Sequence, residues 1–237
     1  MSSESRGVVV LPGAGSFGGE FQPLLRGLGP SAWLARYPGR LGRDFGRGAG
    51  SFEEVVRACV AQVHRRRPER PVLVGHSFGA YVAHSVAVAL EAAGTEVSTL
   101  VVVGADAPEL VEVPESATRD RSGTAAYLDA VDPGLVSGES SAEWREVVLD
   151  TALHDLRLLR DFAPPREAKV RCPVLAVRGE ADPLTSDAGL DRWAATTRGG
   201  FRRRVLAGGH SDLLGSPGFA SLVDEVRAAA PADAPAR

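Results

Sequence analysis

Residues 72–80 read Val72-Leu73-Val74-Gly75-His76-Ser77-Phe78-Gly79-Ala80 and hold the most informative pattern in the chain. The apolar run at its start predicts a short buried strand, and the alanine-rich residues 80–92 predict a helix. Between them, Gly-His-Ser-Phe-Gly fits the pattern G-x-S-x-G, which forms a strained strand-to-helix turn that exposes the serine oxygen above a sheet. Gly75 and Gly79 lack a Cβ, so the strand and the helix can approach each other closely around this turn. Ser77 is therefore the candidate nucleophile.

A glycine-rich loop, Pro12-Gly13-Ala14-Gly15-Ser16-Phe17-Gly18-Gly19, follows the first apolar run of the chain. An oxyanion needs two N–H donors held in place. The backbone of Phe78, directly after the serine, is the expected first donor, and Ala14 in this loop is the expected second. The loop also suggests a dinucleotide site, but no acidic residue ends the second predicted strand, as such a site requires.

The bulk composition limits the classes of protein to consider. The chain has 237 residues, of which 44% are hydrophobic and 24% charged, which is typical of one globular domain. A net charge of −3 argues against nucleic-acid binding. No apolar run reaches the length of a membrane span, and no signal peptide is evident. Cys59 and Cys172 make no disulfide framework, so we expect reduced core thiols and a cytoplasmic protein.

Short apolar runs alternate with helical patterns along the chain. Strands that alternate with helices of about ten residues predict an α/β fold with a mostly parallel, doubly wound sheet. The second predicted helix begins at a capping box formed by Ser51 and Glu54. The predicted strands are residues 8–11, 32–36, 72–74, 99–103, 174–177 and 203–206, and the predicted helices are residues 20–28, 52–67, 80–92, 190–197 and 219–229.

Residues 108–169 break this alternation, because they contain no convincing strand. Residues 124–131 predict a short helix, and residues 142–162 predict a longer one. The apolar side of the longer helix is expected to hold Trp144, Val147, Val148, Thr151, Leu158, Leu159 and Phe162. We therefore predict a core of residues 1–107 and 170–237, with residues 108–169 as a helical lid over the edge where α/β sheets bind ligands.

The base and the acid that a serine nucleophile needs follow two late strands. His210 comes directly after the predicted strand 203–206, and Asp182 comes after the strand 174–177. The chain order serine, acid, histidine is that of hydrolases with a G-x-S-x-G turn. Asp106 also follows a strand and is the alternative acid. Asp182 is favoured because Gly-Glu-Ala-Asp-Pro is a tight turn that aims its carboxylate along the sheet edge.

Together these residues resemble the type II thioesterases, the stand-alone editing hydrolases of polyketide and nonribosomal peptide assembly lines. The resemblance runs from about residue 8 to residue 214. It rests on Leu11-Pro12-Gly13-Ala14-Gly15, Phe21-Gln22-Pro23-Leu24, Tyr37-Pro38-Gly39-Arg40, the turn at residues 75–80, and the later segments 104–108, 179–183 and 208–210.

The resemblance implies an α/β-hydrolase fold and hydrolysis of acyl thioesters held on the phosphopantetheine arm of an acyl or peptidyl carrier protein. It implies Ser77, His210 and Asp182 as the catalytic triad, with no metal and no bound cofactor. We expect a monomer with no nucleic-acid or membrane partner.

The chain departs from the family pattern around the acyl pocket and the lid. Ser211-Asp212 follow the histidine where aromatic residues are usual, Gly13 replaces a larger residue, and residues 149–155 lack the usual Pro and Arg-Ala-Asp pattern. Two alternatives stay open at this point: an ester or lactone hydrolase or acyltransferase with the same triad, and a catalytically silent binding protein.

Overall fold

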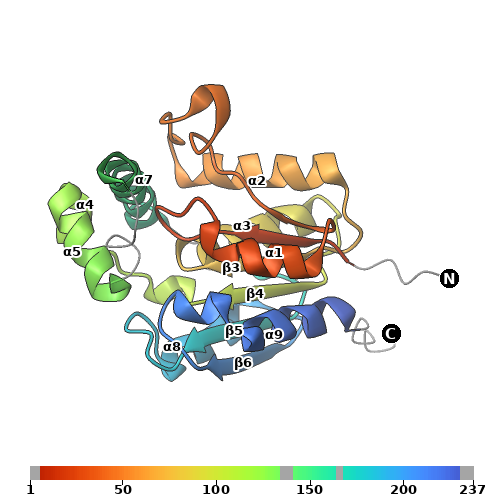
Figure 1. Cartoon of the computed structure of the whole chain (residues 1–237). Helices are drawn as coiled ribbons and strands as arrows, with labels where there is room; N and C mark the ends of the chain where they lie inside the picture. Colours follow the sequence, from red (N-terminus) through yellow and green to blue (C-terminus); the bar gives the residue numbers. More distant parts are fainter. Residues whose placement is uncertain (1–5, 134–140, 164–167, 230–237) are drawn as a thin grey trace.

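A six-stranded, fully parallel sheet forms the centre of the computed structural model, which describes residues 6–133, 141–163 and 168–229 (Figure 1). The strand order is β2-β1-β3-β4-β5-β6. The chain therefore starts one strand in from an edge, adds β2 at that edge, and then crosses back over β1 to add β3, β4, β5 and β6 in order. The strands are β1 (Val8–Leu11), β2 (Ala32–Leu34), β3 (Val72–His76), β4 (Thr99–Val103), β5 (Val174–Gly179) and β6 (Phe201–Leu206).

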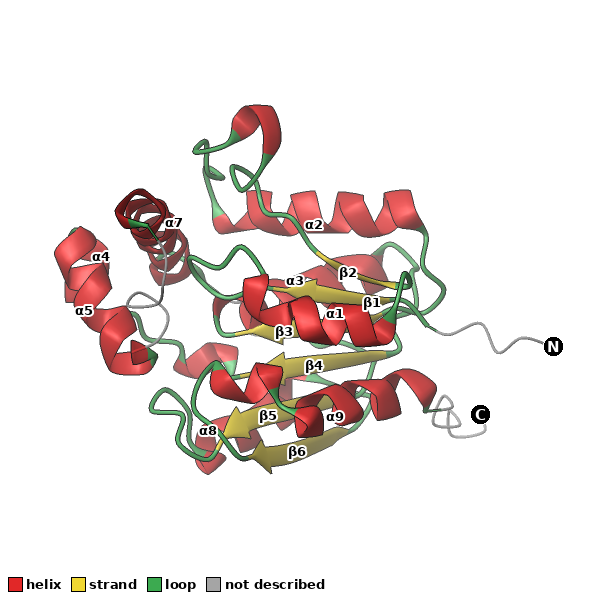
Figure 2. Cartoon of the chain, viewed as in Figure 1, coloured by secondary structure: helices red, strands yellow, loops and turns green. Residues whose placement is uncertain are grey.

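Helices cover both faces of the sheet, so side chains of the central strands are buried on both sides (Figure 2). Along β1, Val8 and Val10 pack into the cluster that holds α1 and α9, whereas Val9 and Leu11 pack into the cluster that holds α2 and α3. This alternation is the period of two expected of a strand. One face of the sheet is covered by α1 (Gln22–Leu28) and α9 (Pro217–Ala228). The other is covered by α2 (Phe52–Arg66), α3 (Phe78–Ala92) and α8 (Asp187–Asp191).

The structure confirms the predicted fold class, and the elements differ from prediction mainly at their ends. Residues 20–28 form a 3-10 turn followed by α1, and residues 187–196 form α8 followed by another 3-10 turn. The capping box at the start of α2 is shifted by one residue. Ser51 accepts the Glu54 N–H at 3.3 Å, but the Glu54 carboxylate accepts the N–H of Gly50, at 2.6 Å.

Strand β6 lies at the edge of the sheet and is the most exposed strand. Its arginine run is explained by this position, because charged side chains on an edge strand discourage pairing with another chain. Arg203 also forms ion pairs with Asp187 and Asp191 at the end of the neighbouring crossover.

The inserted segment lies beyond the carboxyl ends of the strands (Figure 1). Its described helices are α4 (Glu115–Arg119), α5 (Arg121–Val131) and α7 (Ala142–Arg160). Leu128 of α5 packs with Leu149 and Ala152 of α7, and Arg121 forms ion pairs with two carboxylates of α7. The sequence predicted α5 and α7 but not α4.

Helix α7 buries Leu158 and Leu159 as predicted, but the rest of its buried face differs from the predicted one. Trp144 is 40% exposed and contacts the ring of Phe17 at 4.7 Å. Helix α7 has 19 residues and is amphipathic. Among the described helices, including α7, none has both the length and the apolar character of a membrane span. The buried positions of α7 are Leu149, Ala152, Leu153, Asp155, Leu156, Leu158 and Leu159.

Candidate active site

Ser77 occupies a strained turn between β3 and α3. Its φ of 53° and ψ of −123° are rare for a residue with a side chain, and strain of this kind collects at functional sites. Two glycines permit the turn. A Cβ at Gly75 would lie 2.2 Å from the carbonyl oxygen of Gly79, and one at Gly79 would lie 2.1 Å from that of Leu11. The turn therefore has the form that G-x-S-x-G predicts, with the serine at its tip.

His210 and Asp182 form a buried pair at the ends of β6 and β5. His210 Nδ1 lies 3.0 Å from Asp182 Oδ1, which also accepts the N–H of Leu184 at 2.9 Å. The two loops can meet because Gly179 has no side chain: a Cβ there would lie 2.4 Å from the carbonyl oxygens of Gly208 and Gly209.

The environment keeps the Asp182 carboxylate ionised. Burial opposes ionisation, but the hydrogen bond and electrostatic interaction with His210, together with the hydrogen bond from the Leu184 N–H, favour it, so the pKa of Asp182 is lowered. An ionised carboxylate at Nδ1 selects the imidazole tautomer whose Nε2 is left free to accept a proton.

Asp106 supports the loop of Asp182 and is not bonded to the histidine. Its carboxylate accepts the N–H of Ser186 at 3.1 Å, and its carbonyl oxygen accepts the Tyr81 hydroxyl, also at 3.1 Å. Of the two acids that the sequence offered, the structure therefore brings Asp182 to His210.

Ser77 and His210 line the same cavity, of about 220 Å³. The Ser77 N–H donates to Val103 at the end of β4, at 2.8 Å, and the next residue, Gly104, lies against the His210 ring. Within the described residues no hydrogen bond joins the Ser77 hydroxyl to His210. Hydrogen bonds of this kind are often long in enzymes without substrate and tighten when substrate binds.

His76 lies beneath His210 and binds its backbone. His76 Nε2 is 3.0 Å from the His210 carbonyl oxygen, and the two rings are 4.7 Å apart. Burial, aided by the neighbouring His210 ring, lowers the pKa of His76 to about 3, so the ring is neutral at pH 7 and donates to the carbonyl. His76 therefore helps to fix the His210 loop.

Phe78 and Ala14, the two residues with the expected oxyanion donors, line the same cavity as Ser77. Phe78 is the first residue of α3, so its N–H has no partner within the helix. In the glycine-rich loop, the Cα of Gly13 approaches Ser77 so closely that a Cβ there would lie 3.4 Å from the serine Cβ. The N–H of the next residue, Ala14, donates no hydrogen bond to any residue that the structure describes.

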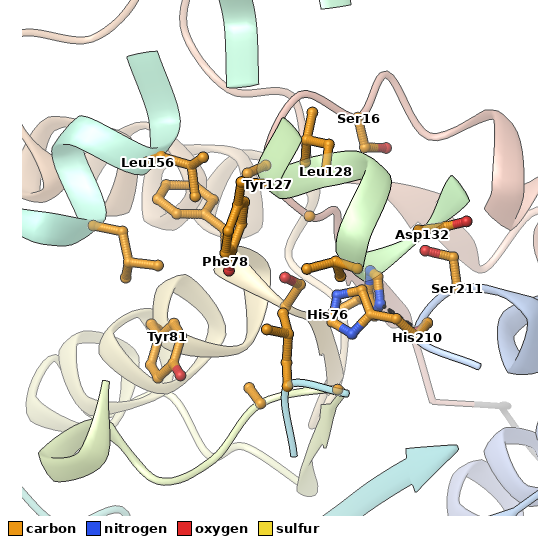
Figure 3. A pocket seen from close by; sticks show the side chains of 18 of the residues that line it. Ser16, His76, Phe78, Tyr81, Tyr127, Leu128, Asp132, Leu156, His210 and Ser211 are labelled. Carbon is orange, nitrogen blue, oxygen red and sulfur yellow. Dashed lines mark hydrogen bonds between the residues drawn. The ribbon is translucent and has the colours of Figure 1, made fainter. Parts of the chain in front are cut away.

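The cavity has an apolar side and a polar side (Figure 3). The polar side adjoins His210 and includes Glu20, whose carboxylate accepts the Ser16 hydroxyl at 2.5 Å. Burial raises the pKa of Glu20 above its usual value despite this bond. The apolar side is formed by Phe78, Tyr81, Tyr127, Leu128, Leu156 and Leu159, and the polar side by Ser16, Glu20, Asp132 and Ser211.

Inserted helices α5 and α7 supply much of the apolar side, and the sequence predicted their segment over this edge of the sheet without naming any of its side chains as site residues. Tyr127 and Leu128 come from α5, and Leu156 comes from α7. Their apolar spacing was visible in the sequence, but it does not say that these helices face the cavity.

Comparisons with known proteins agree with this architecture. The family model "Thioesterase domain" matches residues 6–229. A Streptomyces griseus protein named "Probable cadicidin biosynthesis thioesterase" is 29% identical over 86% of this chain and 57% of its own length. "Thioesterase PikA5" of Streptomyces venezuelae is 31% identical over 86% of this chain and 74% of its own length. The chain thus spans little more than half of the first relative.

Solved structures show the same fold at lower identity. The type II thioesterase BorB, from the borrelidin biosynthetic cluster, superposes with a TM-score of 0.84 over 95% of this chain and 94% of its own, at 24% identity. RedJ, a thioesterase of the prodiginine pathway of Streptomyces coelicolor, gives a TM-score of 0.80 over 93% and 84%, also at 24% identity. The chain has an α/β-hydrolase fold and belongs to the thioesterase domain family.

Proposed function

We propose that this protein is a serine hydrolase that cleaves acyl thioesters from the phosphopantetheine arm of carrier proteins and so removes stalled or aberrant chains. The observation that carries the proposal is that His210, which is bonded to the buried Asp182, lines the same cavity as Ser77. Membership of the thioesterase family supports the thioester as the bond that is cleaved. One relative is named for cadicidin biosynthesis and one structural neighbour for an NRPS/PKS biosynthetic pathway, and these names support carrier-bound substrates.

In the first step the Ser77 oxygen attacks the thioester carbonyl carbon while its proton moves to His210 Nε2. The carbonyl oxygen becomes an oxyanion, which the N–H groups of Phe78 and Ala14 stabilise. The C–S bond then breaks, and the departing sulfur receives the proton from His210. Asp182 stabilises the imidazolium that exists between these two transfers.

In the second step water attacks the acyl group on Ser77, and its proton passes to His210. The same two N–H groups hold the second oxyanion. The bond from the acyl carbon to the serine oxygen breaks, the oxygen regains a proton from His210, and the carboxylic acid leaves. This chain's side chains and backbone supply every group that these steps need, so the mechanism uses no metal and no bound cofactor.

The two sides of the cavity suit the two parts of such a substrate. The apolar side, with its tyrosines and leucines, fits an acyl chain. The polar side beside His210 offers oxygen acceptors for the amide N–H groups of a phosphopantetheine arm. A carrier protein would deliver this arm from outside, and we expect the enzyme to act as a cytoplasmic monomer on it.

Product analysis with matched substrates tests the proposal. An acyl carrier protein loaded with acetyl, butyryl or hexanoyl groups is incubated with the enzyme, and its mass is compared with that after incubation with the Ser77→Ala variant. Simple esters of the same acids serve as the parallel substrates. The proposal predicts that the carrier loses its acyl group only with the wild type. Turnover of esters far faster than of the carrier thioesters would favour the ester hydrolase instead.

A further inference from the structure

A buried ion pair joins the inserted helix α7 to the loop after β1. The carboxylate of Asp155, on α7, accepts the N–H of Gly15 at 2.9 Å. The same oxygen accepts a hydrogen bond from Arg40 Nη2 at 2.5 Å. The two charged side chains are only 7% and 6% exposed. Gly15 directly follows Ala14, the expected oxyanion donor.

Aromatic residues hold the arginine of this pair in place. The Arg40 guanidinium lies 5.2 Å from the centre of the Phe17 ring and 5.5 Å from that of Tyr37. The Tyr37 hydroxyl donates to the Pro12 carbonyl at 2.9 Å. The loop that carries Ala14 is thus bonded just before Ala14, through Pro12, and just after it, through Gly15.

Helix α7 also packs directly on the loop backbone. Gly15 has a φ of 74°, and a Cβ there would lie 2.8 Å from the Cβ of Ala152, one turn before Asp155. This approach leaves little room for the loop to shift while α7 stays in place.

Stability alone is a poor explanation for this pair. Removing two charges from water costs several kcal/mol per ion, and apolar residues of similar volume are often equally stable. Arg40 Nη1 is also buried and has no hydrogen-bond partner within the described residues. The pair does, however, place the Asp155 carboxylate where it accepts the N–H of Gly15, the residue after Ala14.

We propose that Asp155 is a positioning residue for the oxyanion hole: it fixes Gly15, and through it the direction of the Ala14 N–H, while Arg40 holds the carboxylate in place. The inference rests on the proposed role of Ala14 in the function above. It couples the inserted segment to the chemistry, because the hole is complete only while α7 is seated on the loop.

Two double variants separate positioning from stability. Both replace Arg40 by Met, so that neither leaves an unpaired buried charge. R40M/D155N keeps an amide oxygen that can accept the Gly15 N–H, whereas R40M/D155L has a side chain of similar size with no acceptor. The readout is the rate at which a fluorophosphonate labels Ser77, because this reaction also builds negative charge in the oxyanion hole and needs no carrier protein.

We expect R40M/D155L to be labelled at least about 10-fold more slowly than R40M/D155N, since loss of an oxyanion donor costs about 10²–10³ in rate. With a thioester substrate the loss should fall on kcat and leave KM nearly unchanged. Thermal melting must show both variants folded. If R40M/D155L unfolds, R40M/D155A takes its place, and its labelling rate is compared with that of R40M/D155N.

His154→Ala is the matched control. His154 Nε2 lies 2.9 Å from the Ala49 carbonyl oxygen, so it anchors the same turn of α7 to a different loop. This variant should melt at a lower temperature and keep its labelling rate. Equal labelling of the two double variants overturns the inference and leaves the proposed function standing. If the wild type is not labelled at Ser77, the proposed function fails first.

Discussion

His210 bonds to Asp182 and not to Asp106, although both acids follow strands of the same sheet. Asp182→Asn should therefore lower kcat by about 10³–10⁴-fold, because the amide favours the wrong imidazole tautomer. Asp106→Asn should change kcat by only a few-fold, since its amide oxygen can still accept the Ser186 N–H. Steady-state kinetics with an acyl thioester compare the two variants.

Both substitutions replace a carboxylate by an amide of the same shape, so each is the control for the other. A larger loss of kcat in the Asp106 variant than in the Asp182 variant would transfer the role of the acid to Asp106.

The sequence named Ser77 and His210 without the structure and favoured Asp182 as the acid, with Asp106 as the alternative. A G-x-S-x-G turn and a histidine after a late strand are local patterns. The choice between two acids depends on how loops pack, and here Gly179 lets the Asp182 loop reach the His210 loop. The contribution of His76 was also invisible, because its hydrogen bond reaches a residue 134 positions away.

Among the secondary-structure elements, the junction of β3 with α3 has little space for change. Gly79→Ala should cost at least about 1–3 kcal/mol of unfolding free energy, because its Cβ would lie 2.1 Å from the Leu11 carbonyl oxygen. Denaturant unfolding measures the change.

Gly27→Ala, in α1, is the matched glycine for this measurement. Nothing lies within 4 Å of its added Cβ, so it should be neutral or stabilise the protein by up to about 1 kcal/mol. A Gly79 variant as stable as the Gly27 variant would contradict the close approach of α3 to β1.

Helices and strands were predictable where one local pattern dominates. The central strands are largely apolar runs, and α2 begins at the N-cap residue Ser51. Helix α4 was missed because it has only five residues and lies in an acidic, proline-interrupted segment. Part of the buried face of α7 was misplaced because Trp144 contacts another aromatic ring near the surface, whereas the charged Asp155 is buried in an ion pair.

For the molecule as a whole, buried neutral histidines should make stability depend on pH. Burial lowers the pKa of His84 to about 4, against about 6.5 in the unfolded chain. Between these values the unfolded state binds a proton that the folded state does not, so stability falls as pH falls from about 6.5 to about 4.

His84→Leu removes this pH-dependent contribution to the stability of the fold. Between pH 7 and pH 5 the variant should lose about 2 kcal/mol less unfolding free energy than the wild type. Denaturant unfolding at the two pH values gives the difference. An equal loss in both proteins would mean that His84 is protonated as readily in the folded state as in the unfolded one.

The parallel, doubly wound architecture was predictable from the order of the elements, because strands that alternate with helices permit few other topologies. The position of the inserted helices against the loop after β1 was not predictable from the sequence. It depends on contacts such as Asp155 with Gly15, which join residues 140 positions apart.

The most direct measurement is the mass of the Ser77 peptide, taken by rapid quench and proteolysis while the enzyme reacts with an acyl-loaded carrier protein. The account predicts that this peptide transiently gains the mass of the acyl group, and that the signal is absent with Ser77→Ala. Carrier turnover with no acyl group on Ser77, or with the acyl group on another residue, would contradict it.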